Sequence, residues 1–361
     1  MLQNGKIRVI IIDDSAFMRK SLTLMLQSDE NIEIIGTARD GEEGYNLVKD
    51  KRPDVVTLDI EMPRMDGLTA LEKIMKDCPT PVLMVSSLTV EGADATLKAL
   101  ELGAVDFIPK GMSYVNMDIV KIKEDLVAKV KSIAKRKSLR ETLARLKSLT
   151  SKKTSSGHAT QTFITTHKRL NYNYKTIAIG ISTGGPLSLQ KFLPSISEKV
   201  TQPIFIVQHM PPMFTKSLAE RLNSMCSQVV KEGEDGEVVQ NSHMYIAPGG
   251  KHMTILKKSI SQLAIKISEF PNDTLHRPSV DVMMNSVVDI YQDKTLGIIM
   301  TGMGHDGTEG IRKIKNLGGQ CIGQDEESCI VYGMPKSVAD AGLVDVVSPL
   351  EKIADILNYG A

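Results

Sequence analysis

The sequence predicts an α/β protein built of two domains, and three observations lead to this prediction. With 361 residues, the chain has the length of two ordinary domains. In both halves, short apolar and β-branched segments alternate with segments of helical spacing, which is the pattern of a parallel sheet covered by helices on both faces. Between the halves lies a basic stretch and then a Ser/Thr-rich stretch with few apolar residues, a composition typical of a linker.

Charge and aromatic content exclude several classes of protein. Lys+Arg number 44 and Asp+Glu 43, so the formal net charge is +1 and a protein that coats nucleic acid is not expected. Aromatic residues make up 4% of the chain and tryptophan is absent, which disfavours an aromatic stacking platform for single-stranded nucleic acid. We therefore predict no nucleic-acid partner.

The cysteines and the apolar segments bear on location. None of the four cysteines belongs to a Cys-x-x-Cys pair, and a disulfide framework is not expected in a chain of this size. No apolar segment approaches the ~18 residues of a membrane-spanning helix, so we predict no membrane insertion. The apolar run Val9–Ile12 is short and ends in two aspartates, which indicates a buried strand rather than a signal peptide. We expect a cytoplasmic protein that acts as a monomer.

Residues 1–125 carry five strand patterns that alternate with helical ones. Helical spacing is clear over Ser15–Gln27 and Gly67–Lys76. The strands are predicted at Arg8–Asp13, Glu33–Ala38, Val55–Ile60, Val82–Ser86 and Ala104–Pro109. Five such strands predict a doubly wound parallel sheet, in which chemistry takes place at the carboxyl ends of the strands.

Residues 126–174 are predicted to be a basic helical tail followed by a flexible linker. The segment 131–155 holds nine Lys/Arg residues and one acidic residue, Glu141. A solvated charged helix face explains this segment best, and docking to an acidic partner is the alternative. The Ser/Thr-rich stretch after it ends near Tyr174.

Residues 175–361 predict a second α/β domain with a mostly parallel sheet. Strands are expected at Thr176–Ser182, Pro203–Val207 and Gly297–Thr301. Helices are expected from Leu187 onward and over Phe214–Cys226, Ser279–Tyr291 and Gly307–Asn316. The segment Gly236–Lys266 predicts a β-hairpin, with Gly249-Gly250 at a turn.

Acidic side chains gather at the strand ends of the first domain. Asp13 and Asp14 follow the first predicted strand and Asp59 ends the third, so the three carboxylates converge if these strands are neighbours. Three carboxylates this close together repel one another unless a cation neutralises their charge. Because their ligand atoms are all oxygens, Mg²⁺ is the cation that suits them. Ser86 and Lys110 end the fourth and fifth strands, where a hydroxyl and an ammonium are able to contact phosphoryl oxygens if Asp59 carries a phosphoryl group. One such aspartate alone is explained as a helix N-cap, but five polar residues on four strand ends favour a phosphoryl-acceptor site.

The segments LDIEMPRMDG, MVSS and DFIPK make the first domain similar to the receiver domain of two-component response regulators over nearly its whole length. The resemblance implies that Asp59 accepts a phosphoryl group from a histidine kinase and that Ser86 and Lys110 form a switch pair. The sequence departs from the family pattern in one place. Proline usually follows the lysine, whereas here Pro109 precedes Lys110 and Gly111 follows it.

The same resemblance implies a Mg²⁺ site next to the phosphorylated aspartate. Its implied ligands are the carboxylates of Asp14 and Asp59 and the backbone carbonyl of Glu61, with Asp13 contributing through a water molecule.

The run Gly180–Gly185 in the second domain is a candidate nucleophile site. It places Ser182 between a buried strand and a helix, near backbone N–H groups that can stabilise an oxyanion. The spacing differs from the Gly-x-Ser-x-Gly elbow and from nucleotide-binding glycine patterns. When this run is taken alone, a Ser/Thr N-cap with a glycine turn is the favoured explanation.

A serine nucleophile needs a base and an orienting carboxylate. His209 directly follows the apolar strand PIFIVQ, so it lies at a strand end as Ser182 does. Asp306 follows the buried strand LGIIM and opens a helix, and Asp281 is its rival. Ser, His and Asp at three strand ends of one parallel sheet favour catalysis over a core histidine and an N-cap. The remaining histidines are expected in the linker, in hairpins or at the surface; they include His243, His252 and His276.

Five segments, GISTGG, IVQHMPP, YIAPGGKHM, HRPSVDVM and TGMGHDG, make the second domain similar to the catalytic domain of chemotaxis protein-glutamate methylesterases. Together with the receiver domain, the resemblance covers the whole chain except the linker. It implies a triad of Ser182 as nucleophile, His209 as general base and then acid, and Asp306 as the residue that orients the imidazole. It also implies an oxyanion site near Thr183 and Met303.

Two residues of the second domain depart from that family's pattern. His305 stands where asparagine is frequent, and Ile181 replaces a more usual alanine. A second imidazole beside the triad carboxylate is able to change the pKa of that carboxylate.

The resemblance implies hydrolysis of glutamate γ-methyl esters and deamidation of glutamines on methyl-accepting chemotaxis receptors, in the service of chemotactic adaptation. The ester chemistry itself needs no cofactor. The resemblance also implies that the unphosphorylated receiver covers the catalytic cleft and that phosphorylation of Asp59 opens it. Two alternatives stay open at this point. One is a response regulator whose second domain is a non-catalytic binding module, and the other is an esterase that acts on small metabolites.

Overall fold

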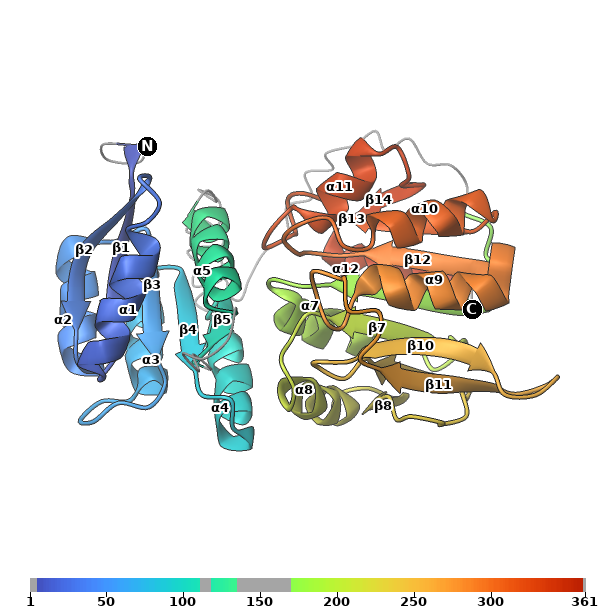
Figure 1. Ribbon diagram of the computed structural model, residues 1–361, viewed down its shortest axis with the longest axis horizontal. Coiled ribbons are helices and arrows are strands. Elements are labelled where there is room, and N and C mark those ends of the chain that lie inside the picture. The colour runs from blue at the N-terminus through green and yellow to red at the C-terminus, as the bar shows by residue number, and fades with distance from the viewer. Residues whose placement is uncertain (1–4, 111–117, 135–169, 360–361) are drawn as a thin grey trace, which may run out of the picture. The chain divides into compact units, whose positions relative to one another are not determined.

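The computed structural model describes residues 5–110, 118–134 and 170–359. The chain divides into two compact units, Met1–Phe163 and Ile164–Ala361, and each is described by itself (Figure 1). Within the described residues, no helix is both long enough and apolar enough to cross a membrane.

The first unit is built on a five-stranded parallel sheet. Its strands are β1 (Ile7–Ile12), β2 (Ile32–Ala38), β3 (Val55–Asp59), β4 (Val82–Ser86) and β5 (Asp106–Pro109). They lie in the order β2-β1-β3-β4-β5, and every neighbouring pair is parallel. The prediction of a doubly wound parallel sheet is confirmed. Because the strand order reverses between β1 and β3, Asp13 and Asp59 lie side by side at this switch point.

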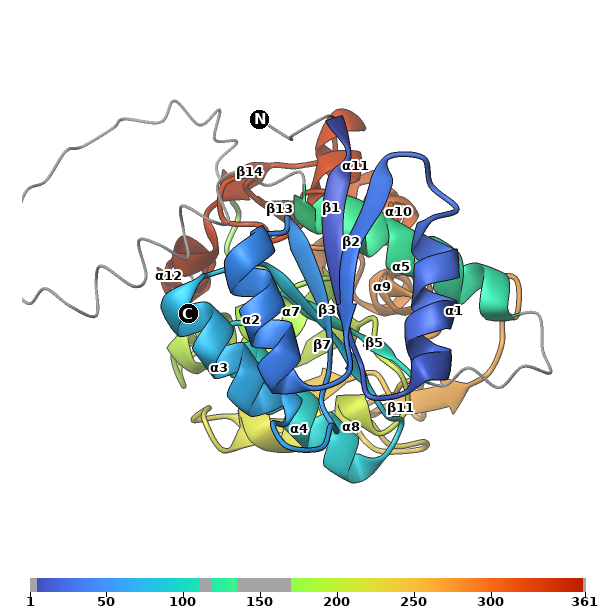
Figure 2. The same cartoon turned by 90° about the vertical axis from the view of Figure 1, so that its left-hand side faces the viewer.

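Helices cover both faces of this sheet. They are α1 (Ala16–Leu26), α2 (Gly41–Lys51), α3 (Gly67–Asp77), α4 (Val90–Glu101) and α5 (Asp118–Ala134). Figure 2 shows α2 and α3 on one face and α1 and α5 on the other. Side chains of Ser15, Asp40, Asp66 and Thr89 accept backbone N–H groups in the first turns of α1 to α4, which fixes where these helices begin.

Helix α5 continues past residue 125, where the first domain was expected to end. Its Leu126, Val130 and Ile133 share one helix face and are buried, and the helix packs against α1. This apolar face explains why the helix belongs to the first unit. The remainder of the basic segment 131–155 lies outside the described residues after Ala134.

Gly67 is required where α3 begins beside the strand that carries Asp59. A Cβ atom on Gly67 would lie 1.9 Å from the Asp59 carbonyl oxygen, which is backbone and cannot turn away. We expect Gly67→Ala to destabilise the first unit by about 1–3 kcal/mol, because the strand or the helix must shift. Urea unfolding monitored by circular dichroism checks this, with the exposed Glu72→Ala in the same helix as the control. An unchanged unfolding midpoint for Gly67→Ala would contradict the prediction.

The second unit contains a seven-stranded parallel sheet and a separate antiparallel hairpin. The strands of the sheet are β6 (Thr176–Ile181), β7 (Ile204–Gln208), β8 (Val229–Glu232), β9 (His243–Ile246), β12 (Thr295–Ile299), β13 (Gln320–Gln324) and β14 (Val346–Ser348). Their order is β14-β13-β12-β6-β7-β9-β8, and all of them are parallel. The predicted α/β fold with a hairpin is confirmed.

The hairpin is smaller than the segment Gly236–Lys266 that was expected to form it. It consists of β10 (His252–Lys257) and β11 (Leu263–Ser268). The preceding residues His243–Ile246 pair in parallel with β7 and so belong to the large sheet. The expectation failed there because β9 is short and buried, and its apolar residues look the same in either kind of sheet.

Helices pack on the seven-stranded sheet between its strands. They are α7 (Gly185–Phe192), η2 (Leu193–Ser195), α8 (Phe214–Asn223), α9 (Val280–Tyr291), η3 (Gln292–Lys294), α10 (Thr308–Asn316), α11 (Met334–Asp340) and α12 (Leu350–Tyr359). Helix α9 packs against α10 and β6, whereas α7 packs against α12 and α8. Methionine and valine side chains of α9 are fully buried in the core between helix and sheet.

Strand β6 is the switch point of the second sheet. The chain passes from β6 to β7 on one side and returns to β12 on the other, so the segments that follow these three strands meet at one edge of the sheet. Ser182 follows β6, His209 follows β7, and Asp306 lies between β12 and α10.

Candidate active site and phosphorylation site

Three carboxylates meet at the carboxyl edge of the first sheet. Asp13, Asp14 and Asp59 each offer an oxygen, and these oxygens lie within 4.8 Å of one another. Asp13 and Asp59 are buried, whereas Asp14 is exposed. A buried, oxygen-only cluster open to solvent on one side is consistent with a Mg²⁺ site.

Burial governs the protonation of this cluster. It raises the pKa of Asp59 to about 6, and the neighbouring Asp13 carboxylate adds to the rise. Burial also raises the pKa of Asp13. For Lys110, burial alone would lower the pKa, but the nearby carboxylates outweigh it and raise that pKa above its ordinary value. The ammonium therefore stays charged, and its Nζ lies 2.6 Å from Asp59 Oδ2 and 3.6 Å from Asp13 Oδ2.

Ser86 and Glu61 lie near the carboxylates but make other contacts. Ser86 is buried at the end of β4, and its hydroxyl donates a hydrogen bond to the Gly92 carbonyl at 3.1 Å. The backbone N–H of Glu61 donates to Asp59 Oδ1 at 3.3 Å. The Lys110 N–H donates to the Ser86 carbonyl at 2.6 Å, which ties the ends of β4 and β5 together.

Ser182 is held at the end of β6 by backbone hydrogen bonds. Its N–H donates to the Thr301 carbonyl at 2.9 Å, and its own carbonyl accepts from the Gly185 N–H at 2.8 Å. Gly184 has a positive φ of 74°, which turns the chain into α7, and a Cβ atom there would strike Ile330. Gly184 is thus explained by the turn that presents Ser182.

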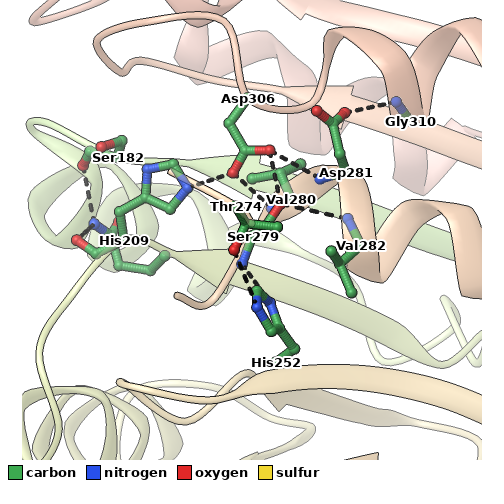
Figure 3. A network of polar contacts seen from close by, with 11 residues as sticks. Ser182, His209, His252, Thr274, Ser279, Val280, Asp281, Val282, Asp306 and Gly310 are labelled. Atoms are coloured by element: carbon green, nitrogen blue, oxygen red, sulfur yellow. Dashed lines mark hydrogen bonds and ion pairs between the residues drawn. The ribbon is translucent and has the colours of Figure 1, made fainter. Parts of the chain in front are cut away.

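His209 and Asp306 form the central contact of the second site. The imidazole Nε2 lies 2.8 Å from Asp306 Oδ2, and both side chains are about nine-tenths buried. Figure 3 shows the imidazole between Ser182 and Asp306. The other ring nitrogen, Nδ1, is buried and has no hydrogen-bond partner among the described residues. With Nε2–H donated to the carboxylate, the Nδ1 lone pair is free to accept a proton.

Asp306 sits at the N-terminus of α9, and this explains its charge. Besides His209, its oxygens accept hydrogen bonds from Val280 N–H at 2.8 Å, Asp281 N–H at 3.0 Å and the Ser279 hydroxyl at 3.0 Å (Figure 3). Burial alone would raise the pKa of Asp306, but His209 and these N–H groups outweigh it and hold that pKa well below its ordinary value. The carboxylate is therefore ionised at neutral pH.

Asp281, the rival carboxylate, points elsewhere. Its Oδ1 accepts the Gly310 N–H at 2.6 Å, which joins α9 to α10, and no contact with His209 is described (Figure 3). Burial raises the pKa of Asp281, and the charge of Asp306 adds to the rise. The geometry thus places Asp306, rather than Asp281, beside the imidazole.

Thr183 and Met303 flank Ser182 from two segments. Thr183 is buried, its carbonyl accepts the Thr301 hydroxyl at 2.9 Å, and its own hydroxyl has no partner among the described residues. Met303 follows Gly302 in the segment after β12. Gly302 lies close to Ser182, since a Cβ atom on Gly302 would be only 2.8 Å from Ser182 Cβ. Among the described hydrogen bonds, neither the Thr183 nor the Met303 backbone N–H is a donor.

Comparison with known proteins identifies the family. Residues 177–357 match the family described as CheB methylesterase, and residues 9–119 match the response regulator receiver domain. The chain is 46% identical to a protein-glutamate methylesterase/protein-glutamine glutaminase of Nitratidesulfovibrio vulgaris, with 98% of this chain and 99% of that protein covered. A protein of the same description from Pyrococcus horikoshii is 45% identical, with 98% and 93% covered. The chain belongs to the CheB protein-glutamate methylesterase/protein-glutamine glutaminase family.

A solved structure supports the same assignment. The CheB methylesterase catalytic domain of Thermotoga maritima is 44% identical to this chain and aligns with a TM-score of 0.50, covering 52% of this chain and 99% of that domain. The chain is thus a hydrolase of the methylesterase and glutaminase class that carries a receiver domain.

The departures from the CheB pattern leave the His209–Asp306 contact intact. The His305 side chain is exposed, and no contact with Asp306 is described. Ile181 is fully buried as the last residue of β6. Pro109 ends β5, and the Lys110 side chain still reaches Asp59; Gly111 lies outside the described residues.

Two histidines of this CheB-family chain lie in places that the sequence did not indicate. His252 was expected at the surface, but it is fully buried. Its Nδ1 accepts the Ser279 N–H at 3.2 Å, and Ser279 in turn contacts Asp306. The ring of His276 stacks on that of His209. The motif HRPS, just before α9, was the signal for His276, whereas no local signal pointed to His252.

Gln208 is a further residue that the sequence analysis missed. It is buried at the end of β7, and its Nε2 donates to the Ser182 carbonyl at 3.0 Å and to the His209 carbonyl at 3.2 Å. One amide group thus bridges the backbones of two site residues. The signal was a polar residue that ends an otherwise apolar strand directly before the histidine.

We expect Gln208→Met to lower kcat about 10- to 100-fold, because a side chain of similar size removes the bridge and lets the two strand ends move apart. Gln190→Met is the matched control, since Gln190 is also buried and its Nε2 has no partner among the described residues. Steady-state ester hydrolysis by the two purified variants checks this. Equal kcat values for both variants would show that the bridge has no effect on the reaction.

Proposed function

We propose that this chain hydrolyses glutamate γ-methyl esters, and deamidates glutamines, on methyl-accepting chemotaxis receptors, through a triad of Ser182, His209 and Asp306. The observation that carries the proposal is the imidazole of His209, which is held at Nε2 by Asp306 and has its Nδ1 free on the side of Ser182. We also propose that phosphorylation of Asp59 activates the enzyme and that a chemotaxis histidine kinase is the phosphodonor.

The proposed reaction runs through an acyl-enzyme. His209 Nδ1 takes the proton of the Ser182 hydroxyl as its oxygen attacks the ester carbonyl, and Asp306 stabilises the imidazolium. The backbone N–H groups of Thr183 and Met303 stabilise the oxyanion. The imidazolium then gives its proton to the leaving methoxide, and methanol departs. Water, activated by the same Nδ1, attacks the acyl-enzyme and releases glutamate and free Ser182; with a glutamine substrate, ammonia leaves instead.

The proposed reaction does not require a hydrogen bond between the Ser182 and His209 side chains before substrate binds, since such contacts often tighten only in the enzyme–substrate complex. The backbone frame is in place beforehand. His209 N–H donates to the Ile181 carbonyl at 3.2 Å, and Gln208 bridges both residues.

The receiver site fits Mg²⁺. The Asp13 Oδ2 atom is buried without a hydrogen-bond partner among the described residues, and the donors are hard oxygens. Asp14, Asp59 and the Glu61 carbonyl would hold the ion, with Asp13 contributing through water, and the bound cation neutralises charge on the phosphoryl group. Lys110 contacts the phosphoryl oxygens in this proposal, and Ser86 turns from the Gly92 carbonyl toward them as the second member of the switch pair.

The remaining expectations stay predictions. We propose that the two functional domains are those predicted at 1–125 and 175–361, with α5 extending the first of them to Ala134. We also propose that the remainder of the segment 126–174 joins them and that the enzyme works as a monomer in the cytoplasm. None of the four cysteines takes part in a disulfide, in keeping with the reducing compartment proposed.

Replacing Asp59 by asparagine is expected to remove activation by a phosphodonor and to leave basal hydrolysis intact, because the amide cannot accept the phosphoryl group. Methanol release from methylated receptor cytoplasmic fragments, with and without a small-molecule phosphodonor and Mg²⁺, checks this. Asp50→Asn, an exposed aspartate of α2, is the matched control and should respond to phosphodonor as the unchanged chain does. Activation that persists in Asp59→Asn would contradict the proposed switch while leaving the esterase proposal in place.

A further inference from the structure

A second imidazole lies against the catalytic one. The ring centroids of His276 and His209 are 4.1 Å apart, and the two ring planes are inclined by 19°, which is a close stacked arrangement. His276 belongs to the segment between β11 and α9, far along the chain from His209. We propose that His276 is a positioning residue for the reaction, which confines the plane of the His209 ring. This inference rests on the proposed function, because it assigns His276 a task in the triad.

The segment that carries His276 is anchored on both sides of it. Before His276, the Pro271 carbonyl lies 3.1 Å from His252 Nε2. After it, the Ser279 N–H donates to His252 Nδ1 at 3.2 Å (Figure 3). His252 is fully buried, and burial lowers its pKa, so the neutral ring accepts at Nδ1 and donates at Nε2. One buried imidazole thus fixes both ends of the loop and sets the place of His276.

The triad needs such a support because Asp306 fixes the His209 ring at one point only. The hydrogen bond at Nε2, 2.8 Å long, restrains the distance between the two atoms, but a single hydrogen bond tolerates some rotation of the ring about its Cβ–Cγ bond. Turning moves Nδ1 away from Ser182. A ring stacked on one face of His209 blocks this motion and keeps Nδ1 directed at the nucleophile.

The stack also acts on charge during the reaction. When His209 takes the Ser182 proton, its ring becomes a cation, and an aromatic face within about 6 Å attracts a cation. The interaction is therefore stronger in the transition state than in the free enzyme, so its loss lowers kcat rather than weakening substrate binding. An aromatic ring of any kind at position 276 preserves both effects.

The test compares the full-length chain with His276→Ala, which removes the stack, and His276→Phe, which keeps an aromatic ring. The measured quantities are kcat and KM for methanol release from a methylated receptor fragment. We expect His276→Ala to lower kcat about tenfold or more with KM changed less than about twofold, and His276→Phe to recover kcat to within about threefold of the unchanged chain. His243→Ala is the matched control, since His243 also stacks on a ring, that of Tyr245, away from the site; its kcat should stay unchanged.

Several results would overturn the proposal. They are an unchanged kcat in His276→Ala, a His276→Phe variant as slow as His276→Ala although its thermal midpoint is that of the unchanged chain, and a loss that resides in KM alone. Ser182→Ala is assayed in parallel to separate this inference from the proposed function. If Ser182→Ala is as active as the unchanged chain, the proposed function fails; if it is inactive while His276→Ala is fully active, only the role of His276 fails.

Discussion

Replacing Ser182 by alanine is expected to abolish ester hydrolysis, with kcat reduced by roughly 10⁴-fold or more. The substitution removes the only atom that forms the acyl bond in the proposed mechanism, while the frame around it remains. The backbone of Ser182 is held through its N–H by the Thr301 carbonyl and through its carbonyl by Gly185 and Gln208, and a methyl group fits wherever the serine Cβ and Oγ lie. In the proposed mechanism, any residual rate comes from substrate binding and from the Thr183 and Met303 N–H groups, which stabilise the oxyanion that forms when water attacks the ester.

Methanol release from methylated receptor fragments measures this loss. The assay compares the unchanged chain, Ser182→Ala and Ser261→Ala, each with and without phosphodonor and Mg²⁺. Ser261 is an exposed serine in the turn of the β10–β11 hairpin, so its alanine variant controls for a lost hydroxyl without touching the site. A thermal midpoint for Ser182→Ala within about 2 °C of that of the unchanged chain, which for a unit of this size corresponds to less than about 1 kcal/mol, shows that folding is intact.

Each other outcome of this assay points to a different function. If Ser182→Ala still releases methanol at the rate of the unchanged chain, Ser182 is not the nucleophile. Release that requires Ser182 but ignores phosphodonor would keep the esterase and remove the switch at Asp59. No release from a folded, phosphorylated chain would favour a second domain that only binds, and hydrolysis of small free esters in place of receptor esters would favour an esterase for small metabolites.

The arrangement of the sheets was predictable because buried parallel strands can be recognised from short apolar runs in the local sequence. Runs such as Val82–Val85 and Ile177–Ile181 consist of apolar residues, as is typical of strands buried on both faces, and the strands that contain them are buried along their whole length. Once a run is recognised as such a strand, the residue that follows it lies at the carboxyl edge, where Ser182 and His209 are found. Periodicity and topology together thus gave the location of the candidate residues, without any knowledge of side-chain contacts.

The supports of the site could not be predicted in this way, because they depend on side-chain direction and on loops. Nothing local distinguishes His252, which is buried beneath the loop before α9, from a histidine on the outside of a hairpin. Gln208 is a strand residue whose role follows only from the position of β6 beside β7. Asp306 was expected at the start of α10, and the structure shows it accepting N–H groups of α9, a helix that begins 26 residues earlier in the chain than this carboxylate.

The second large effect is expected from Asp306→Asn, which should lower kcat about 10³- to 10⁴-fold. The two oxygens of Asp306 face four donors: His209 Nε2 and Val280 N–H at Oδ2, and the Ser279 hydroxyl and Asp281 N–H at Oδ1. An asparagine must turn its NH₂ group toward one of these pairs. If the NH₂ group faces His209, the ring must accept at Nε2 and carry its proton on Nδ1, so the base is lost.

The other orientation of the amide sets its NH₂ group against the Asp281 N–H, which twists the first turn of α9 and weakens the support of His209. Either way, the negative charge that stabilises the imidazolium is gone. Asp281→Asn is the contrasting variant, because an asparagine oxygen still accepts the Gly310 N–H and no contact of Asp281 with His209 is described. We expect its kcat to stay within about fivefold of that of the unchanged chain.

Steady-state kinetics at neutral pH, where the lowered pKa of Asp306 leaves the native carboxylate ionised, distinguishes the two aspartates. The Ser182 hydroxyl gives a second, independent readout, since its rate of labelling by a fluorophosphonate depends on the same base. Labelling should slow in Asp306→Asn and not in Asp281→Asn. The opposite ranking of the two variants would make Asp281 the orienting carboxylate, and it would require the imidazole to leave the Asp306 oxygen to which the structure joins it.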